Sequence, residues 1–305
     1  MALSALSGDE QGVLFVQLCN VLDPGVAVAL SSVSNELRTA TRVPLQQLKT
    51  DHEAAAALCR KLGHRNCKEL REAKEVDCYN KGLTADELKL LGTLGSVLPA
   101  LEILRLSQQA AGPEGVQQLA AGLGAGALPA VTWFRIIGTH VGDAGASALA
   151  AALDRGALPR LEVLVLIRDG ITDARLVALA PALRRLPALE TLDLGRNLFG
   201  DDGLATLVAP APPAVTSPTP TGVLTKLRVL NLCYTQVLDP GCVALTTALD
   251  SGALPALKSL YLYGIPASTS ARCAVHAALE MPVVLPRPIL GGGYMGRAGW
   301  RRTWA

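Results

Sequence analysis

The feature that most constrains the fold of this chain is a short phrase, Leu-Pro-Ala-Leu-Glu-x-Leu-x-Leu, that recurs along much of its length. Its copies begin at Leu98, Leu128, Leu158, Leu186, Leu224 and Leu254, and successive starts are 30, 30, 28, 38 and 30 residues apart. A fixed period of this length is typical of repeat architectures, in which each unit buries its apolar surface against its neighbours. The sequence therefore predicts a stack of similar units.

The one long step of 38 residues contains a proline-rich stretch at 209–222. Its five prolines can neither continue a helix nor donate a backbone hydrogen bond to a strand ladder. We therefore expect this stretch to be a loop inserted into an otherwise regular array.

Each unit divides into an extended half and a helical half. The alternation in Leu-x-x-Leu-x-Leu predicts a strand, and the segment after it has the apolar spacing of a helix. The clearest helical halves begin at Asp143, Asp173, Asp201 and Asp239. An aspartate at a helix start is expected to accept hydrogen bonds from the free backbone N–H groups of that helix. The phrase Gly-Ala-Leu-Pro at 126–129, 156–159 and 252–255 predicts the helix stop and the turn into the next strand.

A degenerate unit precedes the clear ones. Val76 and Cys78 fall on the last two leucine positions, 28 residues before the corresponding positions of the next unit. Thr84 and Glu87 then have the spacing of a capping box, which predicts the start of the following helix.

This pattern resembles the leucine-rich repeat family, specifically its ribonuclease-inhibitor-like subclass with a full helix in each unit. The resemblance covers about residues 70–280. It implies an α/β fold, a curved solenoid with parallel strands on the concave side and helices on the convex side. The family's asparagine after the strand is kept at Asn197 but replaced by Thr139, Asp169 and Thr235 in other units, so no continuous asparagine hydrogen-bond ladder is expected.

The chain outside the repeats divides into two further parts. Residues 1–63 lack the repeat and are predicted to form a helical N-terminal cap with helices at about 9–21, 24–38 and 44–62. The solenoid is expected to span 64–280, and the proline- and arginine-rich residues 281–305 are expected to form a flexible basic tail. A basic and aromatic patch in that tail, for RNA or anionic lipid, is the alternative.

The expected functional surface lies on the concave side. The closing leucines of each phrase, such as Leu104 and Leu106, are predicted to point into the core, and the residues between and after them to point outward into solvent. The partner-binding residues predicted there are Tyr79, Ile103, Arg105, Trp133, Arg135, Val165, Ile167, Arg168, Asp193, Tyr234, Tyr261 and Tyr263. Apolar surface anchored by Tyr, Trp and Arg suits a protein partner. The alternative is that strands favour aromatic and β-branched residues for their own packing.

The sequence favours an intracellular protein-interaction scaffold, a non-catalytic module that binds a protein partner on its concave face. One alternative is an F-box-type substrate receptor of a ubiquitin ligase. The run from Leu18 to Pro24, followed by Leu30 and Leu37, is similar to the core of an F-box, which would dock a ligase adaptor through 9–38. Another alternative, by family analogy, is a GTPase-activating regulator.

Catalytic and cofactor signatures are not found in the sequence. Cys59, His64, Cys67 and Cys78 have the wrong spacing for a zinc site, and the glycines from Gly291 to Gly296 lack the strand and helix that a dinucleotide site needs. We therefore expect no metal, no cofactor and no enzymatic activity.

Composition and charge restrict the partners and the compartment. The chain has 28 basic and 26 acidic residues, and the basic surplus lies in the tail, so nucleic acid is not an expected partner of the folded part. Seven cysteines without a Cys-x-x-Cys pair indicate reduced thiols. No apolar stretch is long enough to span a membrane and no signal peptide is recognised, so a cytoplasmic or nuclear protein, not a secreted one, is expected.

Overall fold

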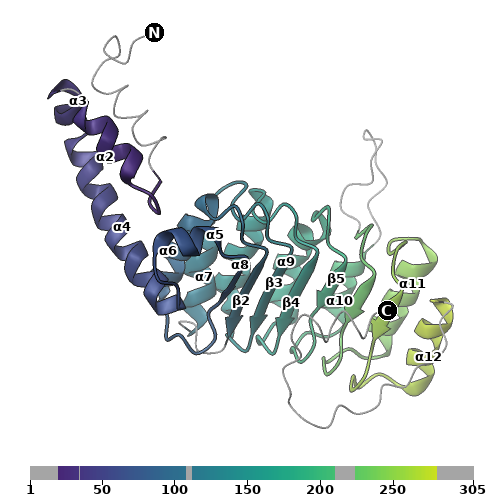
Figure 1. Cartoon of the computed structure of the whole chain (residues 1–305). Coiled ribbons are helices and arrows are strands. Elements are labelled where there is room, and N and C mark those ends of the chain that lie inside the picture. The colour runs from purple at the N-terminus through teal and green to yellow at the C-terminus, as the bar shows by residue number, and fades with distance from the viewer. Residues whose placement is uncertain (1–19, 34, 108–111, 210–223, 280–305) are drawn as a thin grey trace.

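Seven parallel strands form one sheet, and their order in the sheet follows their order in the chain (Figure 1). The computed structural model describes residues 20–33, 35–107, 112–209 and 224–279. The strands are β1 (Glu75–Asp77), β2 (Ile103–Ser107), β3 (Trp133–Ile137), β4 (Val163–Ile167), β5 (Thr191–Asp193), β6 (Val229–Asn231) and β7 (Ser259–Tyr261). The predicted repeat is therefore one continuous stack. The proline-rich stretch from 210 and the tail from 280 lie outside the described residues.

Helices return the chain from one strand to the next, and they lie on one face of the sheet, leaving the other face open (Figure 1). They are α6 (Ala85–Thr93) with the short 3-10 helix η2 (Leu94–Val97), α7 (Gly112–Gly122), α8 (Gly142–Asp154), α9 (Asp173–Arg184), α10 (Asp201–Val208), α11 (Asp239–Asp250) and α12 (Thr269–Ala278). This is the expected curved α/β solenoid.

The sheet and the helices share one core because equivalent side chains of successive repeats are in register. Leu104 of β2 aligns with Phe134 of β3, and Phe134 aligns with Leu164 of β4. All three side chains are buried. The same column continues through Leu192, Leu230 and Leu260. Burying each large apolar side chain contributes about 1.5–3 kcal/mol, and the repeats on either side supply the burial.

Three of the four aspartates predicted to cap their own helices, Asp173, Asp201 and Asp239, cap the next repeat instead, which corrects the sequence expectation. The Oδ1 atom of Asp173 accepts hydrogen bonds from the backbone N–H groups of Gly200 and Gly203, at 2.9 and 2.7 Å, where α10 begins. In the same way, Oδ1 of Asp201 accepts the backbone N–H groups of Leu238 and Gly241, and Oδ1 of Asp239 accepts that of Ser268. Each aspartate is the first helical residue and not the N-cap, so its carboxylate serves the neighbouring helix.

This cap between repeats explains the glycine at the third position of α10 and α11. A β-carbon at Gly203 would lie 2.8 Å from Oδ1 of Asp173, closer than real β-carbons approach an oxygen. The corresponding residue of α9 is Arg175, whose Nε donates to the carboxylate of Asp143 at 2.6 Å. The pattern Asp-x-Gly therefore couples consecutive repeats.

Replacing Gly203 by alanine is expected to lower the free energy of unfolding by about 1–3 kcal/mol, because the new β-carbon displaces the Asp173 carboxylate. The measurement is urea unfolding followed by circular dichroism. Gly124→Ala is the matched control, since a β-carbon at Gly124 meets no atom within 4 Å. An equal, small effect of both substitutions would contradict the inter-repeat cap.

The N-terminal helices extend away from one end of the stack (Figure 1). They are α2 (Gly25–Ser32), α3 (Asn35–Ala40), α4 (Arg42–Leu62) and α5 (Cys67–Glu72), so the expected helix at 24–38 is two helices. The end of α4 packs against the solenoid, since Leu58 and Leu62 belong to its core cluster. The beginning of α4 packs with α2 in a separate small cluster around Ala27 and Leu48. The expected helix at 9–21 lies almost wholly outside the described residues.

Candidate partner-binding surface

The open face of the sheet is formed by the residues that alternate with the core leucines. Trp133, Arg135 and Ile137 of β3 lie there in line with Val163 and Ile167 at the two ends of β4, and all five are half-buried. A half-buried row of aromatic, aliphatic and arginine side chains offers contact area that is already held in place by its neighbours. This face is where the sequence placed its candidate site.

Three of the predicted residues are not open to solvent, contrary to expectation. The exposed fractions of Ile103, Val165 and Asp193 are 3%, 3% and 1%. Each is flanked by a side chain of the adjacent strand on either side: Val165, for example, lies between Arg135 and Asp193. On the inner side of a curved sheet such rows converge, so the flanking side chains cover the central one. These three residues support the surface from beneath.

An ion-pair cluster occupies the first strands of the open face. Arg105 of β2 lies 2.5 Å from the carboxylate of Glu75 and 3.9 Å from that of Asp77, both on β1. The arginine is therefore directed towards the N-terminal edge of the sheet, and its charge is matched within the chain. A partner at this point meets a compensated cluster and not a free cation.

Asp193 places a buried carboxylate near the centre of the same face. Its Oδ1 accepts the N–H of Gly195 at 2.9 Å, and Oδ2 is buried without a hydrogen-bond partner. Burial raises the pKa of Asp193 above its ordinary value, against the opposing effects of the Gly195 amide, Asn231 and Arg135. The indole N–H of Trp133 is likewise buried and unpartnered. The polar groups of this face are thus incompletely satisfied.

The edge of the sheet at the carboxyl ends of the strands carries a second, more exposed row. We call Arg168, Arg196, Tyr234 and Tyr263 the rim cluster. The first three occupy the same position of three consecutive repeats, and their φ angles of 59°, 58° and 57° are left-handed. The guanidinium of Arg196 lies 4.4 Å from the ring centroid of Tyr234, and the rings of Tyr234 and Tyr263 meet edge to face at 5.3 Å. All four side chains are exposed.

Beneath the rim cluster runs a short polar ladder in place of the missing asparagines. Thr139 donates its backbone N–H to Oδ1 of Asp169 at 2.8 Å and its hydroxyl to the same atom at 3.1 Å. The N–H of Asp169 in turn donates to Oδ1 of Asn197 at 3.1 Å. The Nδ2 of Asn197 donates to the carbonyl of Leu166 at 2.7 Å. An asparagine ladder is absent as expected, but threonine and aspartate form part of its bonding.

Asp169 is the residue of this ladder whose pKa is shifted by burial. Burial raises its pKa to about 7, although the hydrogen bonds from Thr139 and the backbone of Gly138 act in the opposite direction. Its Oδ2 is buried with no hydrogen-bond partner. The folded protein therefore holds a proton on Asp169 more tightly than the unfolded chain does, and the stability from this group falls as pH rises from about 4 to about 7.

Asp169→Asn is expected to flatten the pH dependence of stability between pH 5 and 8. It should also raise the free energy of unfolding at pH 8 by about 1–3 kcal/mol, because the buried charge is removed while the acceptor for Thr139 is kept. Thermal or urea unfolding at several pH values measures both effects. The companion substitution Asn197→Asp should destabilise the protein at pH 8. If Asp169→Asn kept the wild-type dependence of the free energy of unfolding on pH, Asp169 would not be the titrating group.

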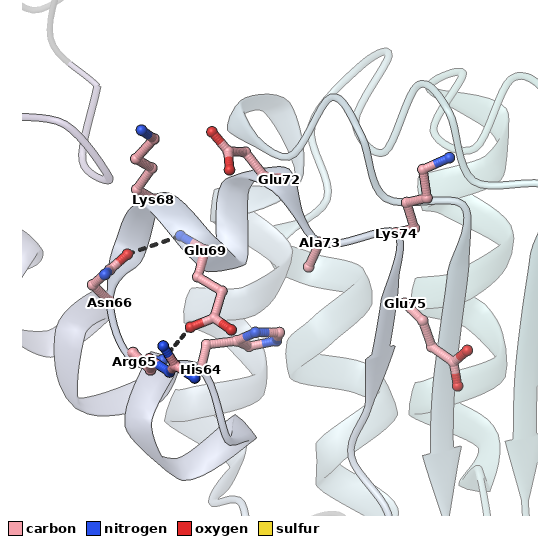
Figure 2. Close-up of a pocket in the computed structure, with 9 residues that line it drawn as sticks. All are labelled: His64, Arg65, Asn66, Lys68, Glu69, Glu72, Ala73, Lys74 and Glu75. Carbon is pink, nitrogen blue, oxygen red and sulfur yellow. Dashed lines mark hydrogen bonds between the residues drawn. The ribbon is translucent and has the colours of Figure 1, made fainter.

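A hollow of about 610 Å³ lies beside α5 and the start of β1 (Figure 2). Its lining residues are His64, Arg65, Asn66, Lys68, Glu69, Glu72, Ala73, Lys74 and Glu75. Glu69 makes two hydrogen bonds in this hollow (Figure 2): its backbone N–H donates to Oδ1 of Asn66 at 2.9 Å, and its carboxylate accepts the backbone N–H of Arg65 at 2.6 Å. The lining mixes both charges and has Ala73 as its one apolar residue, so the open face is the stronger candidate.

The cysteines considered for zinc do not form a metal site in the described part of the chain. The Sγ atoms of Cys59 and Cys67 lie 3.7 Å apart, but no group of three or more potential ligands gathers among the described residues. Burial raises the pKa of Cys59 and of Cys78 to about 12. Both thiols are therefore protonated at neutral pH. In the same described ranges, no helix is long and apolar enough to cross a lipid bilayer.

The repeat architecture agrees with a family model. Residues 186–208, which include β5 and α10, match the leucine-rich repeat model. The seven stacked strand-and-helix units of the described residues have the same leucine-rich-repeat fold. No curated protein matches the sequence significantly.

Several solved structures are similar to this chain. The C-terminal domain of tropomodulin from Caenorhabditis elegans has 14% identity and a TM-score of 0.40, over 64% of this chain and 91% of that one. Actin-binding site 2 of leiomodin-1 has 15% identity and a TM-score of 0.35, over 46% and 72%. An internalin from Listeria monocytogenes has 15% identity and a TM-score of 0.35, over 68% and 60%.

The predicted site residues differ in exposure, and Ile103, Val165 and Asp193 are the buried ones. Trp133, Arg135, Ile167 and Tyr261 are half-buried on the open face, while Arg168, Tyr234 and Tyr263 belong to the exposed rim cluster. Arg105 joins the ion pairs with β1, and Tyr79 is exposed just after that strand. Arg196 was not among the predicted site residues. Its place after the strand, equivalent to Arg168 one repeat earlier, was the signal that could have found it.

Proposed function

We propose that this chain is a non-catalytic protein-interaction module that binds a protein partner on the open face of its sheet. The observation that carries the proposal is the placement of Trp133, Tyr261, Tyr234 and Tyr263 along this one side of the solenoid. Aromatic side chains bury a large area with few rotatable bonds, which is why they anchor protein interfaces.

The packing of this face also suits recognition. The strands beneath it are held by ladders on both sides and by a shared core, so the side chains are arranged before any partner arrives. A surface organised in advance loses little conformational entropy on binding.

Trp133→Ala combined with Tyr261→Ala is expected to weaken capture of the partner by about 10- to 30-fold, the usual effect of truncating central aromatic anchors. The measurement is quantitative mass spectrometry of proteins captured from lysate by the full chain, followed by titration of the captured protein. Val177→Ala combined with Val243→Ala is the matched control, because both valines are exposed on helices of the opposite face.

Two results would count against this proposal. One is equal affinity of the concave-face variant and the wild type. The other is an equal loss in the helix-face control. Trp133→Phe, which keeps a ring at the same place, should recover part of the binding if the ring is the anchor, whereas a general loss of folding would appear in the thermal unfolding of each variant.

A second candidate, docking of a ubiquitin-ligase adaptor through 9–38, is favoured by one observation. Val26, Val28 and Val33 of this segment are exposed, with exposed fractions of 58%, 45% and 73%. A helical element that only capped the solenoid would not need these apolar side chains outside. Co-purification of the full chain with such an adaptor, and its loss in Val28→Asp combined with Val33→Asp, is the test. GTPase activation stays a prediction from family analogy.

A further inference from the structure

The rim cluster contains two arginines in adjacent repeats whose charges are not paired with a carboxylate of the described residues. The backbone ladder continues past the strands here, since Arg168 donates its N–H to the carbonyl of Gly195 at 3.2 Å and Arg196 donates to Cys233 at 2.8 Å. Arg168 and Arg196 therefore stand one strand spacing apart, about 5 Å at the backbone. Within the described ranges, neither guanidinium has a carboxylate within 4.0 Å.

The opposite edge of the sheet provides the contrast. Where the strands begin, charged side chains of neighbouring repeats pair with each other: Lys74 lies 3.3 Å from Glu102, and Arg228 lies 3.7 Å from Glu190. These four side chains are therefore paired within the chain. In the rim cluster, the guanidinium groups of Arg168 and Arg196 are available to an anionic group of another molecule.

The backbone of the rim cluster adds a second, independent observation. The left-handed conformation of Arg168, Arg196 and Tyr234 is one that glycine adopts most easily, and glycine does occupy the equivalent position in the flanking repeats, as Gly138 and Gly264. Large side chains stand in the three middle repeats at a conformational cost. The backbone conformation therefore does not explain why arginine and tyrosine stand at these positions instead of glycine.

The side chains are also arranged for recognition. Arg196 lies over the ring of Tyr234, and that ring is held in place by Tyr263 and by the backbone of Gly264, where a β-carbon would come within 2.5 Å of the ring. Such stacking fixes the guanidinium plane and leaves its N–H groups at the edge to donate to a carboxylate.

We propose that the rim cluster binds an acidic segment of the protein partner, with carboxylates on Arg168 and Arg196 and apolar side chains against Tyr263, Leu198 and Leu238. Both leucines are exposed in the loops next to the cluster. This inference rests on the proposed function and names the chemistry of the partner. Charge complementarity selects an acidic peptide, and the exposed rings and leucines select one with apolar residues beside the acidic ones.

A nucleic acid is the less suitable occupant of the rim cluster. Recognition of single strands requires aromatic rings with a free face on which a base can stack. The ring of Tyr234 is already contacted by Arg196 and Tyr263. A carboxylate needs only the edge of a guanidinium, which the cluster still offers.

The test uses the full chain and a fluorescent random copolymer of glutamate and tyrosine as the probe, in anisotropy titrations at physiological salt. Arg168→Glu combined with Arg196→Glu should weaken binding at least about 10-fold. The matched control is Arg160→Glu combined with Lys226→Glu, which changes the net charge equally at exposed positions outside the cluster and should keep the wild-type affinity. Arg168→Lys combined with Arg196→Lys should lose part of the binding, because lysine cannot form the bidentate contact.

Three results would overturn the inference. They are no binding of the copolymer by the wild type, equal losses in the rim variant and its control, and a preference for polyuridylic acid over the copolymer. Partner capture from lysate separates this inference from the proposed function. If the rim variant keeps the partner while Trp133→Ala with Tyr261→Ala loses it, the rim inference fails and the proposed function stands; if both variants keep it, both fail.

Discussion

The structure depends on a constraint that no single repeat can meet: each strand and helix must bury its apolar side chains and complete its hydrogen bonds against the repeats on either side. The register of the leucine columns supplies the burial, as from Leu104 to Leu164. Polar bonds across repeats are made at the same time by Asp173 at the start of α10 and by Asn197 beneath the rim cluster. Stacking and capping are therefore one cooperative arrangement.

The same constraint creates the candidate surface. When all the helices lie on one face of a parallel sheet, the other face is left open, and its side chains are aligned in rows by the strand register. The central members of these rows become buried, as Val165 and Asp193 are, while the rings and arginines around them stay accessible. The charge of an edge residue such as Arg196 is not paired with a carboxylate among the described residues.

Much of the fold could be predicted because it follows from local periodicity. Strand alternation and the near-constant repeat placed Leu104 and Leu106 in the core and also found the degenerate unit of Val76 and Cys78. The cap made by Asp173 could not be assigned correctly, since sequence shows an aspartate at a helix start but not which helix end lies nearest. The burial of Asp193 was missed because it depends on how the curved sheet brings neighbouring rows together. The ribonuclease-inhibitor-like subclass stays a prediction.

The central claim, that bonds between repeats hold the solenoid together, is tested most directly by native-state hydrogen exchange at single backbone amides. The amides of Thr139, Gly203 and Gly241 donate to side chains of a neighbouring repeat. We expect them to exchange as slowly as the strand amides of β3 and β4, because they open only when repeats separate. Exchange at the rate of exposed loop amides, while the strands stay protected, would contradict it.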